Sequence, residues 1–227
     1  MLLLALDTAT PAGSAALLSD DHLLASRYFD TGLHHSERLF VEIDGMLRAA
    51  GCEAAEIEVV AVTIGPGSFT GLRIGLSAAK GFCLARDDRE LVTVPTLEVL
   101  AGRLPYCQRP VCAMLDARRS EVYAGLYDTT CGLPRAVAGP VAAAPEQIVA
   151  EWHLDEAVFT GDGATRYADL VAGCPGAVVA PPSCNRPDAA TTGWLGLERY
   201  RAGAAADVAA VEPEYLRNPA YRRAASS

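Results

Sequence analysis

The sequence predicts an α/β protein built from two related halves. Residues 2–8 (LLLALDT) form an apolar run that ends with Asp7 and Thr8, and a Pro-Ala-Gly turn leads to a second apolar run at residues 14–18. About 110 residues later the plan recurs, since residues 111–116 (VCAMLD) end in an acid and residues 121–127 return after a turn. Short apolar runs bounded by turn residues are typical of strands. Their recurrence indicates an internal duplication.

A strand, a glycine-dense loop and a helix meet at residues 65–73 (GPGSFTGLR). Residues 57–64 before the loop are β-branched and mostly apolar, which predicts a buried strand, and residues 72–84 after it have the composition of a helix. Glycine permits positive φ and close approach of another group, while Ser68 or Thr70 can cap the helix. The loop residues singled out are Gly65, Pro66, Gly67, Ser68, Phe69, Thr70 and Arg73.

Two neighbouring helices carry more apolar or small surface than one sheet would cover. Residues 36–50 predict the first helix, whose apolar side chains form one stripe at helical spacing and which Ser36 can cap. The second helix carries a ridge of small residues that would let another backbone approach closely. Stripe and ridge comprise Leu39, Phe40, Ile43, Leu47, Gly71, Leu72, Gly75, Ala78, Ala79 and Phe82. This surface either packs on the chain's own core or binds a partner helix pair, and the pattern alone leaves both open.

The 227 residues are enough for two small lobes. We expect residues 1–105 to form the first lobe, with the glycine loop and both helices, and residues 106–227 to form a reduced second lobe. Residues 157–164 repeat the strand and glycine loop, but much of the second half is rich in Pro, Gly and Ala. Further expected elements are helices near residues 145–151, 164–172 and 189–202, and a short strand or extended arm at residues 212–217.

Composition limits the function classes. The net charge of −9 opposes non-specific attraction to a phosphate backbone, so the chain alone should bind nucleic acid poorly. The apolar start ends at Asp7, too early for a signal peptide or membrane span, and we expect a cytoplasmic protein without membrane contact. Seven cysteines, with no Cys-x-x-Cys pair, indicate neither a disulfide framework nor a zinc ribbon.

Two acids stand where two-lobed nucleotide-binding folds hold a phosphate-bound metal. These are Asp7, followed by Thr8, and Asp116, followed by Ala117. The alternative is a strand-end carboxylate that accepts hydrogen bonds from nearby backbone N–H groups. That alternative is favoured for Asp116, because its turn carries Arg118 and Arg119 in place of the glycines of a phosphate loop.

Other catalytic patterns are missing from the sequence. His34 and His35 start the first long helix, but the residues four positions on are Arg38 and Leu39, so no metal-binding histidine pair is formed. The glycine loop lacks the Gly-x-Ser-x-Gly elbow, since its serine is one position early, and it lacks the Gly-Lys-Ser/Thr ending of a P-loop. We expect no metal site and no catalytic nucleophile.

Six ordered motifs together resemble the bacterial TsaB family, the partner subunit of the machinery that makes threonylcarbamoyladenosine in tRNA. They span nearly the whole chain. The motifs are LALDTAT from residue 4, HSERL from residue 35, GPGSFTGLRIG from residue 65, DARRSEVY from residue 116, GDG from residue 161 and EPEYLR from residue 212.

This resemblance implies a duplicated ribonuclease-H-like fold of the actin-like, hexokinase-like ATPase group, without catalytic competence of its own. The related catalytic subunit TsaD carries a histidine pair on the helix that matches residues 35–47, and this sequence lacks the pair. The resemblance implies a vestigial nucleotide site at Asp7 and Thr8, no intrinsic cofactor, and ATP and metal in the partner subunits.

The resemblance also implies the partners. TsaB binds TsaD through its first two helices, a surface to which the HSERL motif adds His35 and Ser36 here, and it forms a homodimer when alone. The ATPase TsaE joins the complex, which moves a threonylcarbamoyl group from its adenylate to N6 of the adenosine beside the anticodon in tRNAs reading codons that begin with A. We expect tRNA to reach this chain only through the complex.

Two other functions stay open at this point. A small-molecule kinase or ATPase of the same fold would need phosphate-binding carboxylates and a second glycine loop. Asp7 is present, but the arginine-bearing turn after Asp116 counts against this function. A metalloprotease is suggested only by the older glycoprotease-like grouping of the family, and the missing ligand pair speaks against it.

Overall fold

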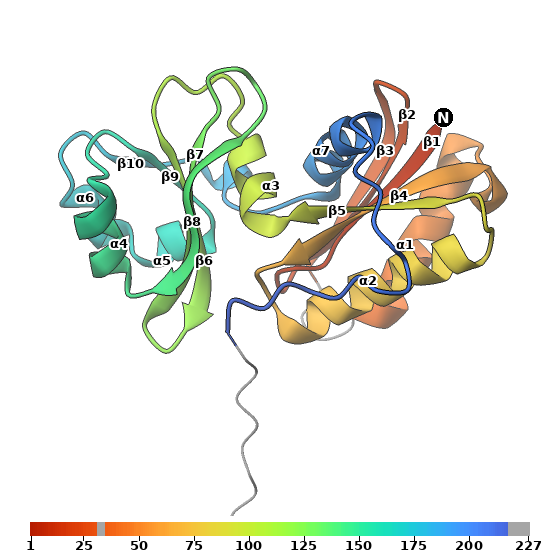
Figure 1. The fold of residues 1–227 in the computed structure, drawn as a ribbon, viewed down its shortest axis with the longest axis horizontal. Helices are drawn as coiled ribbons and strands as arrows, with labels where there is room; N and C mark the ends of the chain where they lie inside the picture. Colours follow the sequence, from red (N-terminus) through yellow and green to blue (C-terminus); the bar gives the residue numbers. More distant parts are fainter. Residues whose placement is uncertain (31–34, 218–227) are drawn as a thin grey trace, which may run out of the picture.

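The computed structural model describes residues 1–30 and 35–217, and in the first helix it describes side chains from residue 38 onward. The chain forms two lobes side by side, each built on a five-stranded mixed sheet (Figure 1). The sheet of the first lobe has the order β3-β2-β1-β4-β5, and that of the second has the order β10-β9-β6-β7-β8.

The first lobe contains the two longest helices. Its strands and helices are β1 (Leu2–Asp7), β2 (Gly13–Ser19), β3 (His22–Phe29), α1 (His35–Ala50), the 3-10 helix η1 (Ala54–Glu56), β4 (Ile57–Gly65), α2 (Phe69–Leu84), β5 (Glu90–Pro95) and α3 (Thr96–Gly102). Strands β1 and β2 pair antiparallel, whereas β1, β4 and β5 run parallel.

The second lobe repeats this arrangement with slightly longer antiparallel strands but much shorter parallel strands after them. Its elements are β6 (Val111–Arg118), β7 (Glu121–Asp128), β8 (Arg135–Ala143), α4 (Pro145–Trp152), β9 (Val158–Thr160), α5 (Asp162–Arg166), α6 (Ala168–Ala172), β10 (Val178–Val179), the 3-10 helix η2 (Pro182–Cys184) and α7 (Ala189–Arg201). Strands β9 and β10 have three and two residues, whereas their counterparts β4 and β5 have nine and six.

The matching strand orders confirm the predicted fold class. In each lobe an antiparallel three-strand meander, β1-β2-β3 or β6-β7-β8, continues into two parallel strands. Asp7 and Asp116 therefore occupy equivalent positions in two copies of one topology. The fold is a duplicated ribonuclease-H-like α/β fold with a reduced second lobe.

One helix from each half packs on the other half's sheet. Helix α7 follows the second lobe in sequence, but it covers one face of the first sheet, where Leu197 packs with Leu3 and Leu18. Helix α3 follows the first sheet, but its Leu97 and Leu100 pack on the second sheet. This exchange ties the lobes together through buried apolar side chains.

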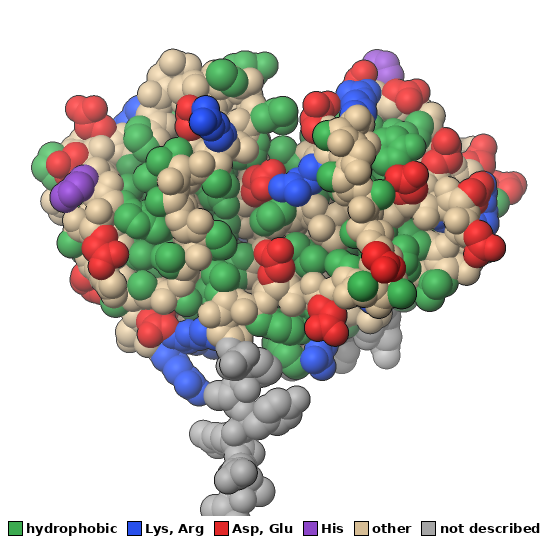
Figure 2. All heavy atoms as spheres, in the orientation of Figure 1, with side chains coloured by type: hydrophobic (Ala, Val, Ile, Leu, Met, Phe, Trp, Pro, Cys, Tyr) green, Lys and Arg blue, Asp and Glu red, His purple; other side chains and the backbone are tan. Residues whose placement is uncertain are grey.

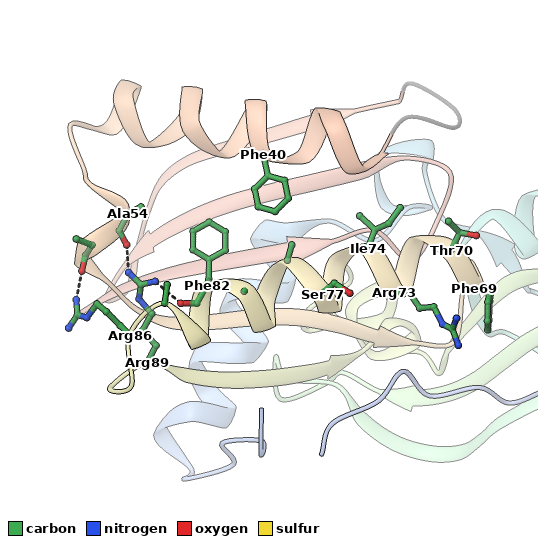
Figure 3. A pocket seen from close by; sticks show the side chains of 14 residues that line it. Phe40, Ala54, Phe69, Thr70, Arg73, Ile74, Ser77, Phe82, Arg86 and Arg89 are labelled. Atoms are coloured by element: carbon green, nitrogen blue, oxygen red, sulfur yellow. Dashed lines mark hydrogen bonds between the residues drawn. The ribbon is translucent and has the colours of Figure 1, made fainter. Parts of the chain in front are cut away.

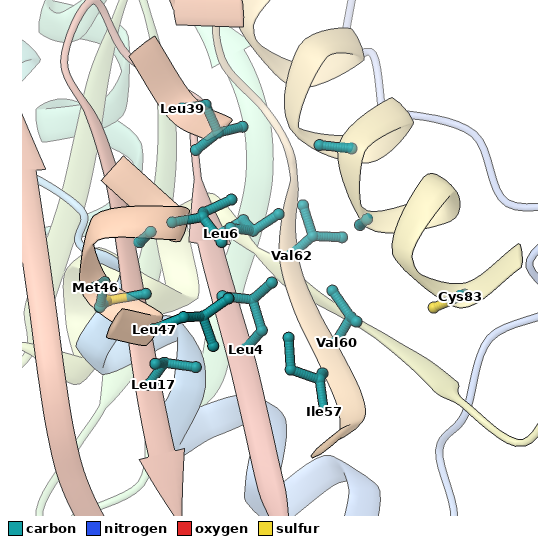
Figure 4. Close-up of a cluster of buried hydrophobic side chains, with 14 of the residues drawn as sticks. Leu4, Leu6, Leu17, Leu39, Met46, Leu47, Ile57, Val60, Val62 and Cys83 are labelled. Carbon is teal, nitrogen blue, oxygen red and sulfur yellow. The ribbon is translucent and has the colours of Figure 1, made fainter. Parts of the chain in front are cut away.

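The opposite face of the first sheet is covered by α1 and α2 (Figure 1). Alternate residues of β1, namely Leu2, Leu4 and Leu6, point into this layer. Figure 4 shows Leu39 and Met46 of α1 packed on the same sheet that supports α2. Because strand side chains alternate between faces, β1 is buried on both of its faces and the first lobe has two apolar layers.

Some elements differ from the sequence prediction. The helix expected at residues 164–172 is split into α5 and α6, and Tyr167 between them has φ −107° and ψ 32°, outside the helical region. The EPEYLR motif forms an extended arm, which was one of the two predicted alternatives. Strand β3, with most side chains exposed, and strand β8, which contains a Gly-Pro pair, were not predicted.

Candidate functional site

A large groove lies between α1 and α2 on the outer side of the first lobe. Its volume is about 920 Å³. Figure 3 shows Phe40 and Phe82 pointing toward each other across it, with Arg86 and Arg89 at one end and Phe69 and Arg73 at the other. The lining residues are Phe40, Ala54, Ala55, Phe69, Thr70, Arg73, Ile74, Ser77, Ala78, Gly81, Phe82, Ala85, Arg86 and Arg89.

The middle of the groove is apolar and open. The rings of Phe40 and Phe82 are stacked with centroids 6.4 Å apart, and the side chain of Phe40 is 52% exposed. Val41 and Leu84 add exposed apolar surface on the same two helices. Contiguous exposed apolar surface of this kind marks a site of interaction with another molecule.

Arginine side chains wall one end of the groove. Arg89 is buried, and its guanidinium donates hydrogen bonds to the carbonyl oxygens of Ile57 (2.8 Å), Phe82 (2.6 Å) and Ala54. Arg86 pairs with Asp88 and donates to the carbonyl of Ala55. These bonds fix η1 against the end of α2, so this wall of the groove is held before any partner binds.

The structure divides the predicted partner surface between core and groove. Leu39, Ile43, Leu47, Leu72 and Ala79 are buried in the core of the first lobe. Phe40, Ala78 and Phe82 line the groove. The side chains of His35 and Ser36 lie outside those that the structure describes. The partner surface thus stays a prediction, with the groove as its accessible part.

Gly71 and Gly75 of α2 face inward. A Cβ on Gly71 would lie 2.0 Å from the carbonyl oxygen of Thr8, and one on Gly75 would lie 2.3 Å from the Thr8 hydroxyl oxygen. The hydroxyl of Thr8 donates a hydrogen bond to the carbonyl of Gly71 at 2.7 Å. The predicted ridge therefore accommodates the end of β1 within the same chain.

Three groove residues of α2, Ile74, Ser77 and Gly81, were not singled out from the sequence although a signal for them exists. Together with Thr70, which was singled out as a loop residue, and Ala85 at the end of the helix, they recur at helical spacing and lie on one face. This second stripe of mostly small residues runs beside the one that packs on the core. Because both stripes are small or apolar, composition does not distinguish the buried face from the open one.

The glycine loop packs between the end of β1 and the C-terminal arm. Ser68 caps α2 as predicted, because its hydroxyl accepts a hydrogen bond from the Gly71 N–H at 3.2 Å. The Ser68 N–H donates to the carbonyl of Ala9 at 2.7 Å. A Cβ on Gly65 would lie 2.4 Å from the carbonyl oxygen of Glu214. The glycine loop is therefore packed against backbone on both sides, which explains why glycine is needed at Gly65.

Asp7 is a buried carboxyl at the end of β1. It accepts hydrogen bonds from the Thr63 hydroxyl at 2.8 Å and from the Ala9 N–H at 3.3 Å. Burial, which disfavours the charged form, raises the pKa of Asp7 to about 6, although both hydrogen bonds act in the opposite direction. The carboxyl is held by the protein and does not face solvent.

The second acid of the duplication is also held by its own lobe. A carboxylate oxygen of Asp116 accepts from the Arg118 N–H at 3.0 Å, and the other forms an ion pair with Arg166 at 2.8 Å. Asp162 accepts from the Asp116 N–H at 2.9 Å, and burial raises the pKa of Asp162 above its usual value. The prediction that Asp116 is a strand-end carboxylate bound to nearby N–H groups is confirmed.

The cleft between the lobes is narrow. Near Asp162 it has a volume of only about 130 Å³, whereas sites for small molecules usually have roughly 300 Å³ or more. Arg186 from the second lobe donates to Asp30 at 3.0 Å and to the Tyr28 hydroxyl at 2.5 Å, which draws β3 toward the cleft. The residues present do not fit a nucleotide with its metal ion.

A duplicated sheet topology with a filled cleft and an open groove on its outer face defines the class of this protein. It is an actin-like, two-lobed fold that presents a large apolar groove outside the cleft. The activator of the 2-hydroxyisocaproyl-CoA dehydratase from Clostridium difficile shares this fold, with a TM-score of 0.51 and 11% identity over 89% of this chain and 97% of that chain.

More similar proteins identify the family. The family model described as "TsaD: tRNA N6-adenosine threonylcarbamoyltransferase" matches residues 30–225. The tRNA threonylcarbamoyladenosine biosynthesis protein TsaB of Escherichia coli (strain K12) is 31% identical over 230 residues, covering 96% of this chain and 95% of that protein. The solved structure of YeaZ from Pseudomonas aeruginosa has a TM-score of 0.82 and 30% identity over 95% of this chain and 99% of that one. The chain belongs to the TsaB family, as its motifs predicted.

Within residues 1–30 and 35–217, no helix combines the length and the apolar character needed to cross a membrane.

Proposed function

We propose that this chain is a non-catalytic activating and scaffolding subunit of a tRNA threonylcarbamoyl transferase complex in the cytoplasm. The complex transfers a threonylcarbamoyl group from threonylcarbamoyl-adenylate to N6 of the adenosine beside the anticodon. The observation that carries the proposal is the contrast between an open apolar groove of about 920 Å³ on the outer side of the first lobe and a pocket of only about 130 Å³ beside Asp162 between the lobes.

The groove supports the partner side of the proposal. TsaD is the expected partner, and its matching helix pair would lie along α1 and α2 with apolar side chains packed around Phe40 and Phe82. A second copy of this chain would use the same surface when TsaD is absent. TsaE would join the heterodimer, and tRNA would contact this chain only as part of the complex.

The cleft supports the non-catalytic side of the proposal. Phosphoryl transfer in this kind of fold needs carboxylates that reach a metal bound to phosphate. Here Asp7 is buried and bonded to Thr63, and Asp116 is paired with Arg166. ATP and metal are accordingly expected in the partner subunits.

The kinase or ATPase alternative would require this cleft to open and both acids to exchange their present partners. No specific observation on the described residues favours the kinase or ATPase function or the metalloprotease function. ATP hydrolysis by the purified chain, measured with and without TsaD, separates the first alternative from the scaffold role.

A charge placed in the middle of the groove tests the proposal directly. We expect Phe40→Asp to weaken binding to TsaD of the same organism at least about 100-fold, because a carboxylate would be buried against apolar side chains without a partner. Leu133→Asp is the matched control, since Leu133 is similarly exposed but lies in the second lobe. Binding is measured by calorimetry and activity by threonylcarbamoyl transfer to tRNA in the reconstituted complex.

Equal affinity of Phe40→Asp and the unsubstituted chain would show that the groove is not the binding surface. Robust transfer or ATP hydrolysis by the isolated chain, abolished by Asp7→Ala, would show that the protein is an enzyme in its own right.

A further inference from the structure

The C-terminal arm, residues 202–217, links the two lobes across the front of the first one (Figure 1). It leaves α7, and Ala206 forms an antiparallel bridge with Leu91 at the edge of the first sheet. Further on, the Glu214 N–H donates to the carbonyl of Ile64 at 2.8 Å, directly before the glycine loop. Arg217 then forms an ion pair with Glu121 of the second lobe.

Tyr215 of this arm contacts two residues that line the groove. Its ring packs on the ring of Phe69 with centroids 5.1 Å apart, and its hydroxyl oxygen accepts a hydrogen bond from Nε of Arg73 at 3.1 Å. The guanidinium carbon of Arg73 lies 4.0 Å from the Phe69 ring centroid. The three side chains form a closed cluster of aromatic and cation–π contacts.

This cluster stands at one end of the groove. Phe69 and Arg73 belong to the first two turns of α2 and form the end wall opposite Arg86 and Arg89 (Figure 3). Tyr215 itself is not among the groove-lining residues and comes from a segment 142 positions after Arg73. The arm therefore supports the wall from behind, whereas the far end is fixed by the backbone contacts of Arg89.

We propose that Tyr215 is a positioning residue for the partner groove, which holds Phe69 and Arg73 in their binding orientation before the partner arrives. The inference rests on the proposed function of the groove. A phenylalanine and an arginine on an open helix surface lose side-chain freedom when a partner binds, and that loss weakens association. Tyr215 orders both side chains within the free chain, so less freedom remains to be lost.

The second lobe takes part through the anchor of the arm. Arg217 pairs with Glu121 and also donates to the carbonyl of Ala117 at 3.3 Å, on the two sides of the turn that joins β6 to β7. These contacts hold the arm on the C-terminal side of Tyr215, and the Glu214 N–H holds it on the N-terminal side. The position of Tyr215 is thus set by both lobes.

The test is a double-mutant cycle on affinity for TsaD of the same organism. Tyr215→Ala should weaken binding on the order of tenfold, and Tyr215→Phe, which keeps the ring contact but loses the hydrogen bond from Arg73, about threefold. In a Phe69→Ala background, Tyr215→Ala should have much less effect than in the unsubstituted chain, because Tyr215 acts largely through Phe69.

Tyr28→Ala is the matched control. Tyr28 also accepts a hydrogen bond from an arginine, Arg186, whose guanidinium carbon lies 6.0 Å from its ring, but this pair is remote from the groove. We expect this variant to bind TsaD normally. Thermal unfolding of each variant establishes that affinity is compared between folded chains.

Unchanged affinity of Tyr215→Ala, or a full tenfold loss that persists in the Phe69→Ala background, overturns the proposal. If Phe40→Asp abolishes binding while Tyr215→Ala leaves it intact, the positioning role fails and the groove remains the partner surface. If Phe40→Asp also binds normally, both the proposed function of the groove and the positioning role of Tyr215 fail.

Discussion

The cleft between the lobes and the groove beside α2 differ in both chemistry and openness. The cleft is lined by polar residues such as Asp162 and Arg186 and has about 130 Å³, whereas the groove is lined mainly by apolar and small side chains and has about 920 Å³. Helix α2 belongs to the groove alone: Gly71 and Gly75 pack against Thr8, its other face lines the groove, and none of its residues lines the cleft pocket. The cleft is instead bridged by Arg186, which donates to Asp30 and Tyr28, whereas the groove stays open as a surface suited to another protein.

The largest expected effect comes from filling the inner face of α2. Gly71→Ala would place a methyl group 2.0 Å from the Thr8 carbonyl oxygen, so the backbone must shift, and we expect a loss of roughly 3 kcal/mol in the free energy of unfolding. Gly81→Ala is the control on the outer face, because nothing lies within 4 Å of its Cβ position. The control should stabilise the helix by roughly 0.5–1 kcal/mol.

Urea unfolding of both variants measures the comparison. Equal stability of Gly71→Ala and Gly81→Ala would mean that the inner face of α2 is not packed as tightly as the contacts indicate.

A second effect concerns how the free energy of unfolding depends on pH through the buried carboxyl of Asp7. In the unfolded chain the Asp7 carboxyl ionises near pH 4, whereas in the folded chain burial raises its pKa to about 6. The folded state therefore holds a proton that the unfolded state has lost, and stability falls as the pH rises from about 4 to about 6. By linkage the free energy of unfolding falls by on the order of 2–3 kcal/mol, and it stays at this lower level above pH 6.

Asp7→Asn removes this titration while keeping an oxygen that can accept from Thr63. The difference in unfolding free energy between pH 4 and pH 7 should therefore shift by about 2 kcal/mol in favour of the variant at the higher pH. Thr63→Val, which removes a donor to the carboxylate, should move the pKa of Asp7 further upward. Identical pH profiles for the unsubstituted chain and Asp7→Asn would contradict a buried, titrating carboxyl at this position.

The smallest expected effect is on tRNA affinity, because neither region presents a basic surface suited to a phosphate backbone. Figure 2 shows acidic side chains spread over both lobes on the visible face, and the net charge is −9. The isolated chain should bind labelled tRNA only weakly at physiological salt, with no submicromolar component. Tight binding that falls steeply with added salt would reveal a direct RNA surface.

The sequence predicted the interior of both sheets well. Strands β1, β4, β6 and β7 were found because their apolar runs are buried on one or both faces, and the duplication followed from the repeated acid and turn after β1 and β6. Edge strands were harder to predict from the sequence. Most side chains of β3 are exposed, including Leu23 and Leu24, so its pattern does not alternate and gives no clear strand signal.

The candidate site was predicted in part. The sequence singled out α1 and α2 as a possible partner surface, which stays a prediction, and gave Phe40 and Phe82, which line the groove. It did not separate them from Leu39 or Gly75, which pack inside the lobe. It also gave no link between Tyr215 and Phe69, because contacts between distant segments leave no local pattern.

The sequence by itself determined the duplicated α/β architecture, the cap of α2 at Ser68 and the family, because these depend on local periodicity, turn chemistry and motifs. Tertiary structure decided which face of α2 is open, that α7 covers the first sheet, and that the arm reaches the glycine loop. Each of these depends on which apolar surfaces meet when the chain folds. Burial is a property of the assembled lobes, and the order of residues along the chain does not specify it.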